Sequence, residues 1–418
     1  MGYVQLSYKP GKNDLVCQFY VESGTGLTIK KAAEHVAAES SIGTWTDVAT
    51  MKPRVRKMGA RVFEIKGNWI KIAYPAELFE AGNMPQIYSS IAGNIFGMKV
   101  IKNLRLESIH WPKSIMKSFK GPVFGISGVR KVLNVRKRPL LGTIVKPKLG
   151  LNEKEHAKVA YDAWIGGLDI VKDDENLTHM KFNKFEKRIK EVLKLRDKAE
   201  KETGEKKMYM PNVTAESKEM LRRAKFVRDS GNEYVMVDIV TTGWSGLQTL
   251  RDANDDLKLV LHAHRAAHAA FTRNPKHGIS MLVLAESARL IGVDQIHIGT
   301  VIGKMEGKEQ DVLDVFEEVE DGVIKEHGHV LGDNWGDIKP VFAVCSGGLH
   351  PGHLPELVKI LGNDIIAQFG GGCHGHPGGT KKGAMAIRQA AEATLHGIDL
   401  KDHAKTNYEL REALRKWG

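Results

Sequence analysis

The segment GLDIVKDDE, residues 167–175, decides the fold assignment, because a short apolar strand runs directly into charged residues. Other segments repeat this pattern of an apolar stretch followed by polar residues or glycine, with helical sequence between them. They are LLGTIVKP (140–147), KMYMPNVT (207–214), YVMVDIV (234–240), LVLHAH (259–264), QIHIGT (295–300), PVFAVCSGG (340–348) and IIAQFGG (365–371). Eight strand–helix units in about 290 residues predict a (β/α)8 TIM barrel. An open doubly wound sheet fits less well, because no G-x-G-x-x-G follows the first strand.

The clearest helical segment between these strands is KFEKRIKEVLKLRDKAEKETG, residues 184–204. Its apolar residues fall on one stripe, and Gly204 provides a stop signal. Residues 181–207 carry eleven Lys or Arg and six acidic residues. We interpret this charge as a solvated helix face rather than a nucleic-acid surface.

The first part of the chain lacks this alternation and reads as a smaller α+β domain. Strands are expected at 4–8, 15–22 and 100–112, helices at 27–41 and 87–98, and a hairpin at 61–75 around Gly67-Asn68. Residues 119–139 read as a linker with a basic run. We therefore predict an N-terminal domain at 1–121 and a barrel at 122–418.

Composition limits the class of protein. A chain of 418 residues with 42% hydrophobic and 27% charged residues is too long for one small domain and fits globular averages. Three cysteines without a C-x-x-C motif indicate a reduced, cytoplasmic protein. The sequence shows no secretory signal and no apolar run approaching 18 residues, so we expect no membrane partner. The net charge of +12 suits solubility, nucleic acid, an anionic surface or a phosphorylated substrate.

The barrel prediction also places the chemistry, because active sites of this fold lie at the carboxyl ends of the strands. The last two strands end in S-G-G and F-G-G-G, where glycine lets backbone N–H groups approach an anion. These glycines indicate a phosphate site, although two tight turns are the alternative. The polar residues and glycines expected at the strand ends are Lys146, Lys148, Lys172, Asp174, Glu175, Asn212, Asp238, His264, Arg265, His297, Ser346, Gly347, Gly348, Gly370 and Gly371.

The charged end of the 167–175 segment has two interpretations. Alternation sends Lys172 and Asp174 to the same side, and paired carboxylates suit Mg²⁺. A charged lysine does not belong among metal ligands, so an internal ion pair is the alternative.

Histidines mark two further strand ends. His262, His264 and His268 raise the possibility of zinc, but a histidine beside Arg265 better suits a phosphorylated, proton-exchanging substrate.

Glycines around Lys304 in GTVIGKMEGK indicate either a lid that carries a cation or an ordinary glycine-rich loop. His374 and His376 read either as structural residues or as residues that support the site without contacting the substrate.

Taken together, these motifs resemble the large subunit of ribulose-1,5-bisphosphate carboxylase/oxygenase (RuBisCO) along essentially the whole chain. The resemblance rests on their order and sequence: GTWT, GNIFG, GTIVKPKLGL, GGLDIVKDDEN, HAHRAAH, HIGTVIGKMEG, SGGLHPGH and QFGGGCHGHPGG. Ile144 replaces a threonine of the plant pattern and Val237 replaces a histidine. Both departures resemble the archaeal form III group.

The resemblance implies a Mg²⁺-dependent carboxylation, and oxygenation, of D-ribulose 1,5-bisphosphate by CO2 or O2. CO2 would convert Lys172 to a carbamate, which holds Mg²⁺ with Asp174 and Glu175 and removes the C3 proton. The resemblance also implies that His264 assists hydration, Lys146 protonates the final carbanion and Lys304 stabilises the new carboxylate. The implied substrate-binding residues are Lys148, Arg265, His297, Ser346, Gly347, Gly348, Gln368, Phe369, Gly370 and Gly371.

The resemblance further implies that each site is completed by a neighbouring subunit, through Glu39, Thr44, Trp45 and Asn94. The expected assembly is a homodimer or a higher assembly of dimers, without a small subunit. The form III likeness implies a role in AMP or nucleoside degradation. Two rival hypotheses are a RuBisCO-like enolase or isomerase acting on another phosphorylated sugar, and a nucleic-acid-binding or scaffold protein.

Overall fold

The computed structural model describes residues 2–44, 46–303 and 308–418. The chain forms two compact units, each taken by itself below. Unit 1 comprises residues 1–121, 267–291 and 321–338, and unit 2 comprises residues 122–266, 292–320 and 339–418. The division into linear domains at residue 121 stays a prediction.

Unit 1 is built on a five-stranded sheet in the order β10-β4-β1-β3-β2. β10 pairs in parallel with β4, and the other neighbours are antiparallel. The expected hairpin is present: Lys66 pairs with Trp69, and Gly67 turns the chain with a φ of +59°, which glycine adopts without strain. The strands are β1 (Asp14–Ser23), β2 (Arg61–Lys66), β3 (Trp69–Pro75), β4 (Ile101–His110) and β10 (Gly278–Ile279).

The helix expected at 27–41 is present as α1, whereas the one expected at 87–98 is divided into α3 and the 3-10 turn η2, with Ala92 and Gly93 between them. At the start of α1 the Thr28 side chain accepts a hydrogen bond from the Lys31 backbone N–H. The strand expected at 4–8 is reduced to a single bridge between Val4 and Val62. The elements are α1 (Ile29–Glu39), α2 (Pro53–Arg56), η1 (Ala76–Leu78), α3 (Met84–Ile91), η2 (Asn94–Gly97), α4 (Lys113–Met116), α10 (Ala269–Thr272), α11 (Met281–Ile291) and the short strands β12 (Val323–Ile324) and β13 (Asp333–Asn334).

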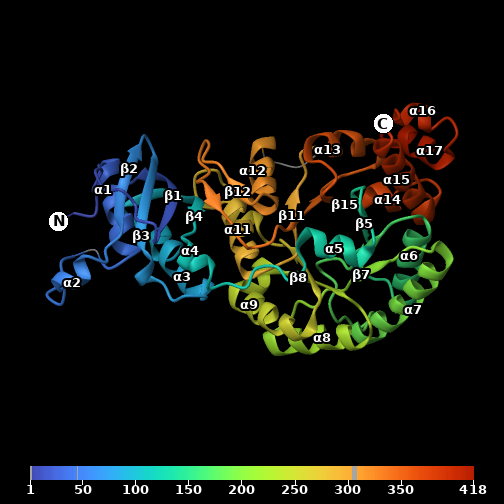
Figure 1. Ribbon diagram of the computed structural model, residues 1–418, viewed down its shortest axis with the longest axis horizontal. Coiled ribbons are helices and arrows are strands. Elements are labelled where there is room, and N and C mark those ends of the chain that lie inside the picture. The colour runs from blue at the N-terminus through green and yellow to red at the C-terminus, as the bar shows by residue number, and fades with distance from the viewer. Residues whose placement is uncertain (1, 45, 304–307) are drawn as a thin grey trace. The chain divides into compact units, whose positions relative to one another are not determined.

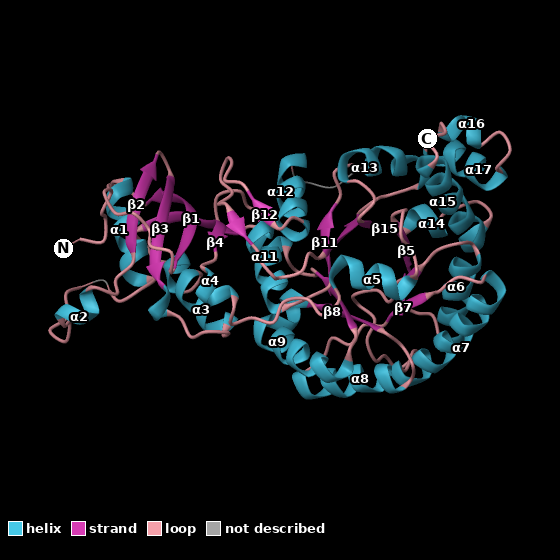
Figure 2. Cartoon of the chain, viewed as in Figure 1, coloured by secondary structure: helices cyan, strands magenta, loops and turns pink. Residues whose placement is uncertain are grey.

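Unit 2 is the predicted α/β barrel, with strands inside and helices around them (Figures 1 and 2). The sheet order is β7-β6-β5-β15-β14-β11-β9-β8, and its neighbours are parallel. The strands are β5 (Leu140–Ile144), β6 (Ile170–Lys172), β7 (Met208–Met210), β8 (Tyr234–Asp238), β9 (Val260–His264), β11 (Gln295–Gly299), β14 (Phe342–Ser346) and β15 (Ile365–Phe369).

Backbone hydrogen bonds close the ring between its two end strands. Val213 N–H donates to Met236 O at 3.0 Å, and Met236 N–H donates to Pro211 O at 2.8 Å. These bonds join the residues after β7 to β8. The carboxyl ends of the eight strands therefore meet at one mouth.

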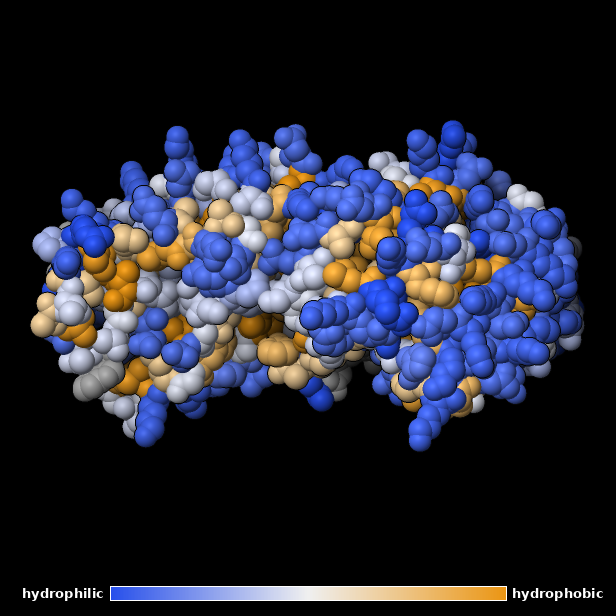
Figure 3. All heavy atoms as spheres, turned by 90° about the horizontal axis from the view of Figure 1, so that it is seen from below, coloured by the Kyte–Doolittle hydropathy of each residue, from blue (hydrophilic) through white to orange (hydrophobic). Residues whose placement is uncertain are grey.

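The helices of unit 2 pack their apolar stripes on the barrel. α7 buries Phe185, Ile189, Val192 and Ala199 and ends at Gly204, which has a φ of +67°. The face of unit 2 seen in Figure 3 is largely hydrophilic, as expected for solvated helix faces. The helical elements are α6 (Glu153–Ile165), α7 (Phe185–Thr203), α8 (Ser217–Asp229), α9 (Ile239–Leu257), α12 (Glu309–Glu320), η3 (Pro351–His353), α13 (Leu354–Leu361), α14 (Gly371–His374), α15 (Gly379–Leu395), α16 (Leu400–His403) and α17 (Tyr408–Trp417).

The predicted linker contains a helix instead of an extended connection. In α5 (Gly125–Leu133), Ile126, Val129 and Leu133 are buried in one cluster with the first residues of several strands, including Leu140. The helix therefore seals the amino-terminal end of the barrel. Within the described part of the chain, no helix is long and apolar enough to cross a membrane.

Candidate functional site

Lys172 ends β6 inside the barrel and is almost completely buried, with 1% exposure. Its Nζ donates to the Asp173 backbone carbonyl at 2.8 Å, contacts Met236 Sδ at 3.3 Å and lies 3.8 Å from Glu175 Oε2. Burial lowers the pKa of Lys172, although the carboxylates around it act in the opposite direction. The side chain therefore favours its neutral, nucleophilic amine more than an exposed lysine does.

Asp174 lies beside Lys146, as expected for two strand ends at one mouth. Lys146 Nζ donates to Asp174 Oδ2 at 2.7 Å, joining the segment after β5 to the segment after β6. Burial alone raises the pKa of Asp174, but hydrogen bonds from Lys146 and Asn176 outweigh it and leave the pKa lowered.

Asp173 points away from this pair. Its carboxylate accepts hydrogen bonds from Tyr209 Oη at 2.5 Å and Asn212 N–H at 3.0 Å, and it pairs with Arg188 at 3.0 Å. Burial raises the pKa of Asp173, but Arg188 and His156 together with Tyr209 bring it down to about 2. This network fixes the end of β6 and so the positions of Lys172 and Asp174.

His264, at the end of β9, is held by Asp238 at the end of β8. Nδ1 of His264 lies 2.9 Å from Asp238 Oδ1, which accepts a hydrogen bond when Nδ1 carries the proton, and 3.2 Å from the Ala266 backbone N–H. Its Nε2 lies 3.6 Å from Glu175 Oε2. Asp238 itself is fixed through its N–H, which donates to Thr214 Oγ1 at 2.9 Å.

His297 links β11 to β14 at the same mouth. Its Nδ1 lies 2.8 Å from Ser346 Oγ, and its Nε2 lies 3.0 Å from Nε2 of the buried His262. Burial lowers the pKa of His297 well below its ordinary value and that of His262 to about 3. Both rings are neutral near pH 7, and one proton lies between their facing nitrogens.

Arg265 follows His264 and lies against Gly299. A Cβ on Gly299 would come within 2.9 Å of the Arg265 guanidinium, and Gly299 has a φ of +103°. Burial lowers the pKa of Arg265 to about 10. A guanidinium in such a place can bind an anion strongly.

The ends of β14 and β15 contain the expected glycines. Gly347 and Gly348 have φ values of +118° and +75°. A Cβ on Gly370 would lie 3.7 Å from Lys146 Cε, so the Lys146 side chain passes over this turn. Gln368 lies over Gly142 with its amide buried, and Phe369 is fully buried.

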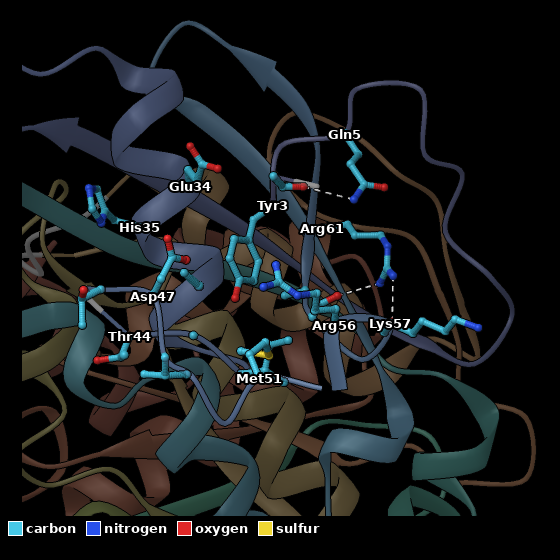
Figure 4. Close-up of a pocket in the computed structure, with 18 of the residues that line it drawn as sticks. Tyr3, Gln5, Glu34, His35, Thr44, Asp47, Met51, Arg56, Lys57 and Arg61 are labelled. Carbon is cyan, nitrogen blue, oxygen red and sulfur yellow. Dashed lines mark hydrogen bonds between the residues drawn. The ribbon is translucent and has the colours of Figure 1, made fainter. Parts of the chain in front are cut away.

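The remaining predicted residues are not part of this cluster. Lys148 is exposed in the loop after β5. In unit 1, Glu39 ends α1, while Thr44 and Asn94 are exposed. Lys304 and Trp45 lie outside the described residues. Thr44 also lines a cavity of about 820 Å³ in unit 1, in which Tyr3 and Arg56 lie next to each other (Figure 4).

The donor set tests which metal the mouth could hold. Among the residues that the structure describes, no three His, Cys, Asp or Glu side chains lie close enough to hold a metal ion. The zinc alternative therefore has no support here. Asp174 and Glu175 offer the carboxylate oxygens that Mg²⁺ prefers, and Lys172 would add oxygen donors as a carbamate.

The comparisons with known proteins agree with this arrangement. Residues 2–115 match the model of the ribulose bisphosphate carboxylase large chain, N-terminal domain, and residues 125–417 match that of its catalytic domain. The chain belongs to the RuBisCO large-chain family.

Curated relatives in this family include the ribulose bisphosphate carboxylases of Methanosarcina barkeri and Methanocaldococcus jannaschii. The first is 53% identical over 99% of this chain and 98% of its own length, and the second is 51% identical over all of both. A solved dimeric archaeal Rubisco from Hyperthermus butylicus has a TM-score of 0.95 at 47% identity, covering 100% of this chain and 98% of its own. An octameric RuBisCO from Pyrococcus horikoshii, in complex with sulfate ion, has a TM-score of 0.92 at 46% identity. The match covers 99% of this chain and 96% of that chain.

Sequence reasoning missed the residues that hold the predicted ones. Asp238 was visible as a strand end, but nothing in the local pattern pairs it with His264. His262 appeared only as a candidate zinc ligand. His374 was interpreted as a structural or supporting residue, but its bond to the end of β5 could not be predicted.

Proposed function

We propose that this chain is a ribulose-1,5-bisphosphate carboxylase whose own residues carry the reaction at the barrel mouth. Family membership supports the reaction class. The observation that carries the proposal for this chain is Lys172: a buried lysine with a lowered pKa, beside Asp174 and Glu175. A neutral amine reacts with CO2 to give a carbamate and a proton. The carbamate would place anionic oxygen donors where the Lys172 ammonium would otherwise carry a positive charge.

The carbamate of Lys172, together with Asp174 and Glu175, would hold Mg²⁺, which supplies Lewis-acid stabilisation of the developing enediolate when bound. The same carbamate accepts the C3 proton of the bisphosphate. C2 of the enediolate then forms a bond to CO2, and water adds at C3. His264, oriented by Asp238, is placed to move a proton during this hydration. Lys146 delivers the last proton to the carbanion left when the C2–C3 bond breaks, and two 3-phosphoglycerates are released.

The two phosphates would bind at opposite sides of the mouth. Arg265, His297 and Ser346 would supply the polar groups of one site, and Gly347 follows Ser346 directly. Gly348, Gly370 and Gly371 would line the other site. There the positive-φ backbone of Gly348 permits close approach of an anion, and Gly370 lies beside Lys146. The proposed substrate-binding and catalytic set also includes Lys148, Gln368, Phe369 and Lys304.

We further propose that the functional unit is a homodimer, or an assembly of dimers without a small subunit. Glu39, Thr44, Trp45 and Asn94 of one chain would complete the site of the other. Mixing Lys172→Ala with Asn94→Ala chains tests this assignment. If both variants are inactive alone, hybrid dimers with one intact site should restore about a quarter of wild-type activity. No recovery, with hybrids shown to form, contradicts shared sites.

The direct test of the reaction is incubation with Mg²⁺, labelled bicarbonate and ribulose 1,5-bisphosphate, followed by analysis for labelled 3-phosphoglycerate. Folded, activated protein that produces no label overturns the proposal. Enolisation without label would favour a RuBisCO-like enolase or isomerase instead. A supply of substrate from AMP or nucleoside degradation, in the cytoplasm, is part of the proposal and rests on the form III likeness alone.

A further inference from the structure

We propose that His374 is a positioning residue that fastens the Gly370–Gly372 turn to the strand leading to Lys146. This inference rests on the proposed function, in which that turn and Lys146 lie beside one phosphate. It concerns a residue that the sequence analysis grouped with His376. The His376 ring bonds backbone groups at Gly378 and Glu409, whereas the His374 ring reaches another strand end of the barrel.

His374 is the last residue of α14, and its ring contacts three residues on two other elements. Nε2 lies 2.8 Å from the Ile144 carbonyl oxygen and 2.9 Å from Thr143 Oγ1, both on β5. Nδ1 lies 2.9 Å from Oγ1 of Thr380, at the start of α15. The ring therefore ties β5 to the segment that follows β15.

The partners determine where the proton lies. The Ile144 carbonyl can only accept, so Nε2 carries the hydrogen. The Thr143 hydroxyl already donates to the Phe369 carbonyl at 2.6 Å, so its oxygen accepts from the same Nε2–H. Nδ1 is then free to accept from the Thr380 hydroxyl. Every polar atom of a neutral ring is satisfied in this way.

The environment supports that neutral form. Burial lowers the pKa of His374 to about 4, and the positive charge of Lys146 acts in the same direction. The ring fastens the turn without adding a second cation beside Lys146. The residues that the ring joins lie next to the proposed phosphate site in the sequence. Phe369 precedes Gly370, and Lys146 follows Ile144 by two residues.

The consequence is a fixed spacing between the glycine turn and Lys146. Thr143 and Phe369 are paired across β5 and β15, and the ring extends this pairing beyond the strand ends. Without the Nε2–H, one link between the turn and β5 is lost, and the strand pairing with the Thr143–Phe369 bond remains. A loosened turn meets the phosphate in more conformations, which weakens binding more than it slows the chemical steps.

The test compares His374→Leu, which removes both ring nitrogens, with His374→Gln, whose amide N–H can replace Nε2–H. His374→Leu should raise the KM for ribulose 1,5-bisphosphate about tenfold, with kcat changed much less. His374→Gln should restore the KM to within about threefold of wild type. A KM for His374→Leu equal to that of wild type overturns the inference, as does equal loss in both variants.

Titration with inorganic phosphate separates this inference from the proposed reaction, because it needs no turnover. His374→Leu should bind phosphate more weakly than wild type, and His374→Gln should bind as wild type does. This pattern supports the inference even if no 3-phosphoglycerate forms. If His374→Leu does not fold, Thr143→Val provides the comparison, because it removes one acceptor and the bond to Phe369. A Thr143→Val protein with unchanged phosphate affinity and unchanged KM overturns the inference.

Discussion

The ammonium of Lys146 lies 2.7 Å from Oδ2 of Asp174. A proposed proton donor is therefore hydrogen-bonded to a carboxylate that is also a proposed ligand of Mg²⁺. If Mg²⁺ binds Asp174 as proposed, it would compete with the Lys146 ammonium for this carboxylate. A Lys146 side chain released from Asp174 could then act on the substrate.

Replacement of Lys146 by glutamine should strengthen binding of Mg²⁺, because it removes both the competitor and a nearby positive charge. We expect an affinity about two- to fivefold higher, measured by calorimetry in the presence of CO2, together with loss of turnover. Lys148→Gln is the matched control, since it removes the same charge from an exposed position two residues away. Equal affinities in the two variants would show that Lys146 does not compete with the metal.

Asp238→Asn should reduce carboxylation because the amide no longer accepts firmly from Nδ1 of His264. The ring would lose its fixed tautomer, and the proton-transfer step would slow by about a hundredfold, with the KM for the bisphosphate nearly unchanged. Steady-state kinetics measure this split. Asp229→Asn, at the exposed end of α8, is the control. If Asp238→Asn kept the wild-type kcat, orientation of His264 by Asp238 would not contribute to the reaction.

The sequence was sufficient for the barrel because each strand is a local apolar run with a polar end. The same reasoning found Lys172, Asp174, His264 and His297, which mark strand ends. It could not find the bond between His374 and Ile144, since 230 residues separate the two and neither pattern specifies the other. It also mistook α5 for a linker, because glycine and the basic run concealed the helical spacing of its apolar residues.

Leu133 tests the corrected role of α5 as a seal of the barrel. It has 1% exposure and lies in the cluster with Leu140 and Ile170. Leu133→Ala should lower the free energy of unfolding by about 2–5 kcal/mol, measured by urea denaturation. Val132→Ala, on a partly buried position of the same helix, should cost less. Equal small losses would mean that α5 does not close the core.

Gly299→Ala should weaken binding of the bisphosphate, since the new Cβ would come within 2.9 Å of the Arg265 guanidinium. The φ of +103° adds backbone strain of about 1–3 kcal/mol to this clash. We expect the KM to rise about tenfold and the melting temperature to fall. Gly322→Ala is the control, because a Cβ there meets no atom within 4 Å and the φ is ordinary. If the KM of Gly299→Ala were unchanged, Arg265 would not contribute to binding of the phosphate.

Asp173→Asn should destabilise unit 2 through Arg188, which would stay buried without its carboxylate. Removing one partner of a buried pair costs about 3–5 kcal/mol. The pKa of about 2 in the folded chain lies below the ordinary 3.8. The carboxylate therefore stabilises the fold fully above pH 4, and about 2 kcal/mol of this contribution is lost as the pH falls toward 2. Urea denaturation of wild type and Asp173→Asn at pH 7, 5, 4 and 3 should show a constant difference that narrows only below pH 4. Asp197→Asn, which breaks an exposed pair with Arg196, should change stability little at any of these values. A difference that narrows already between pH 7 and 5 would assign the effect to another group.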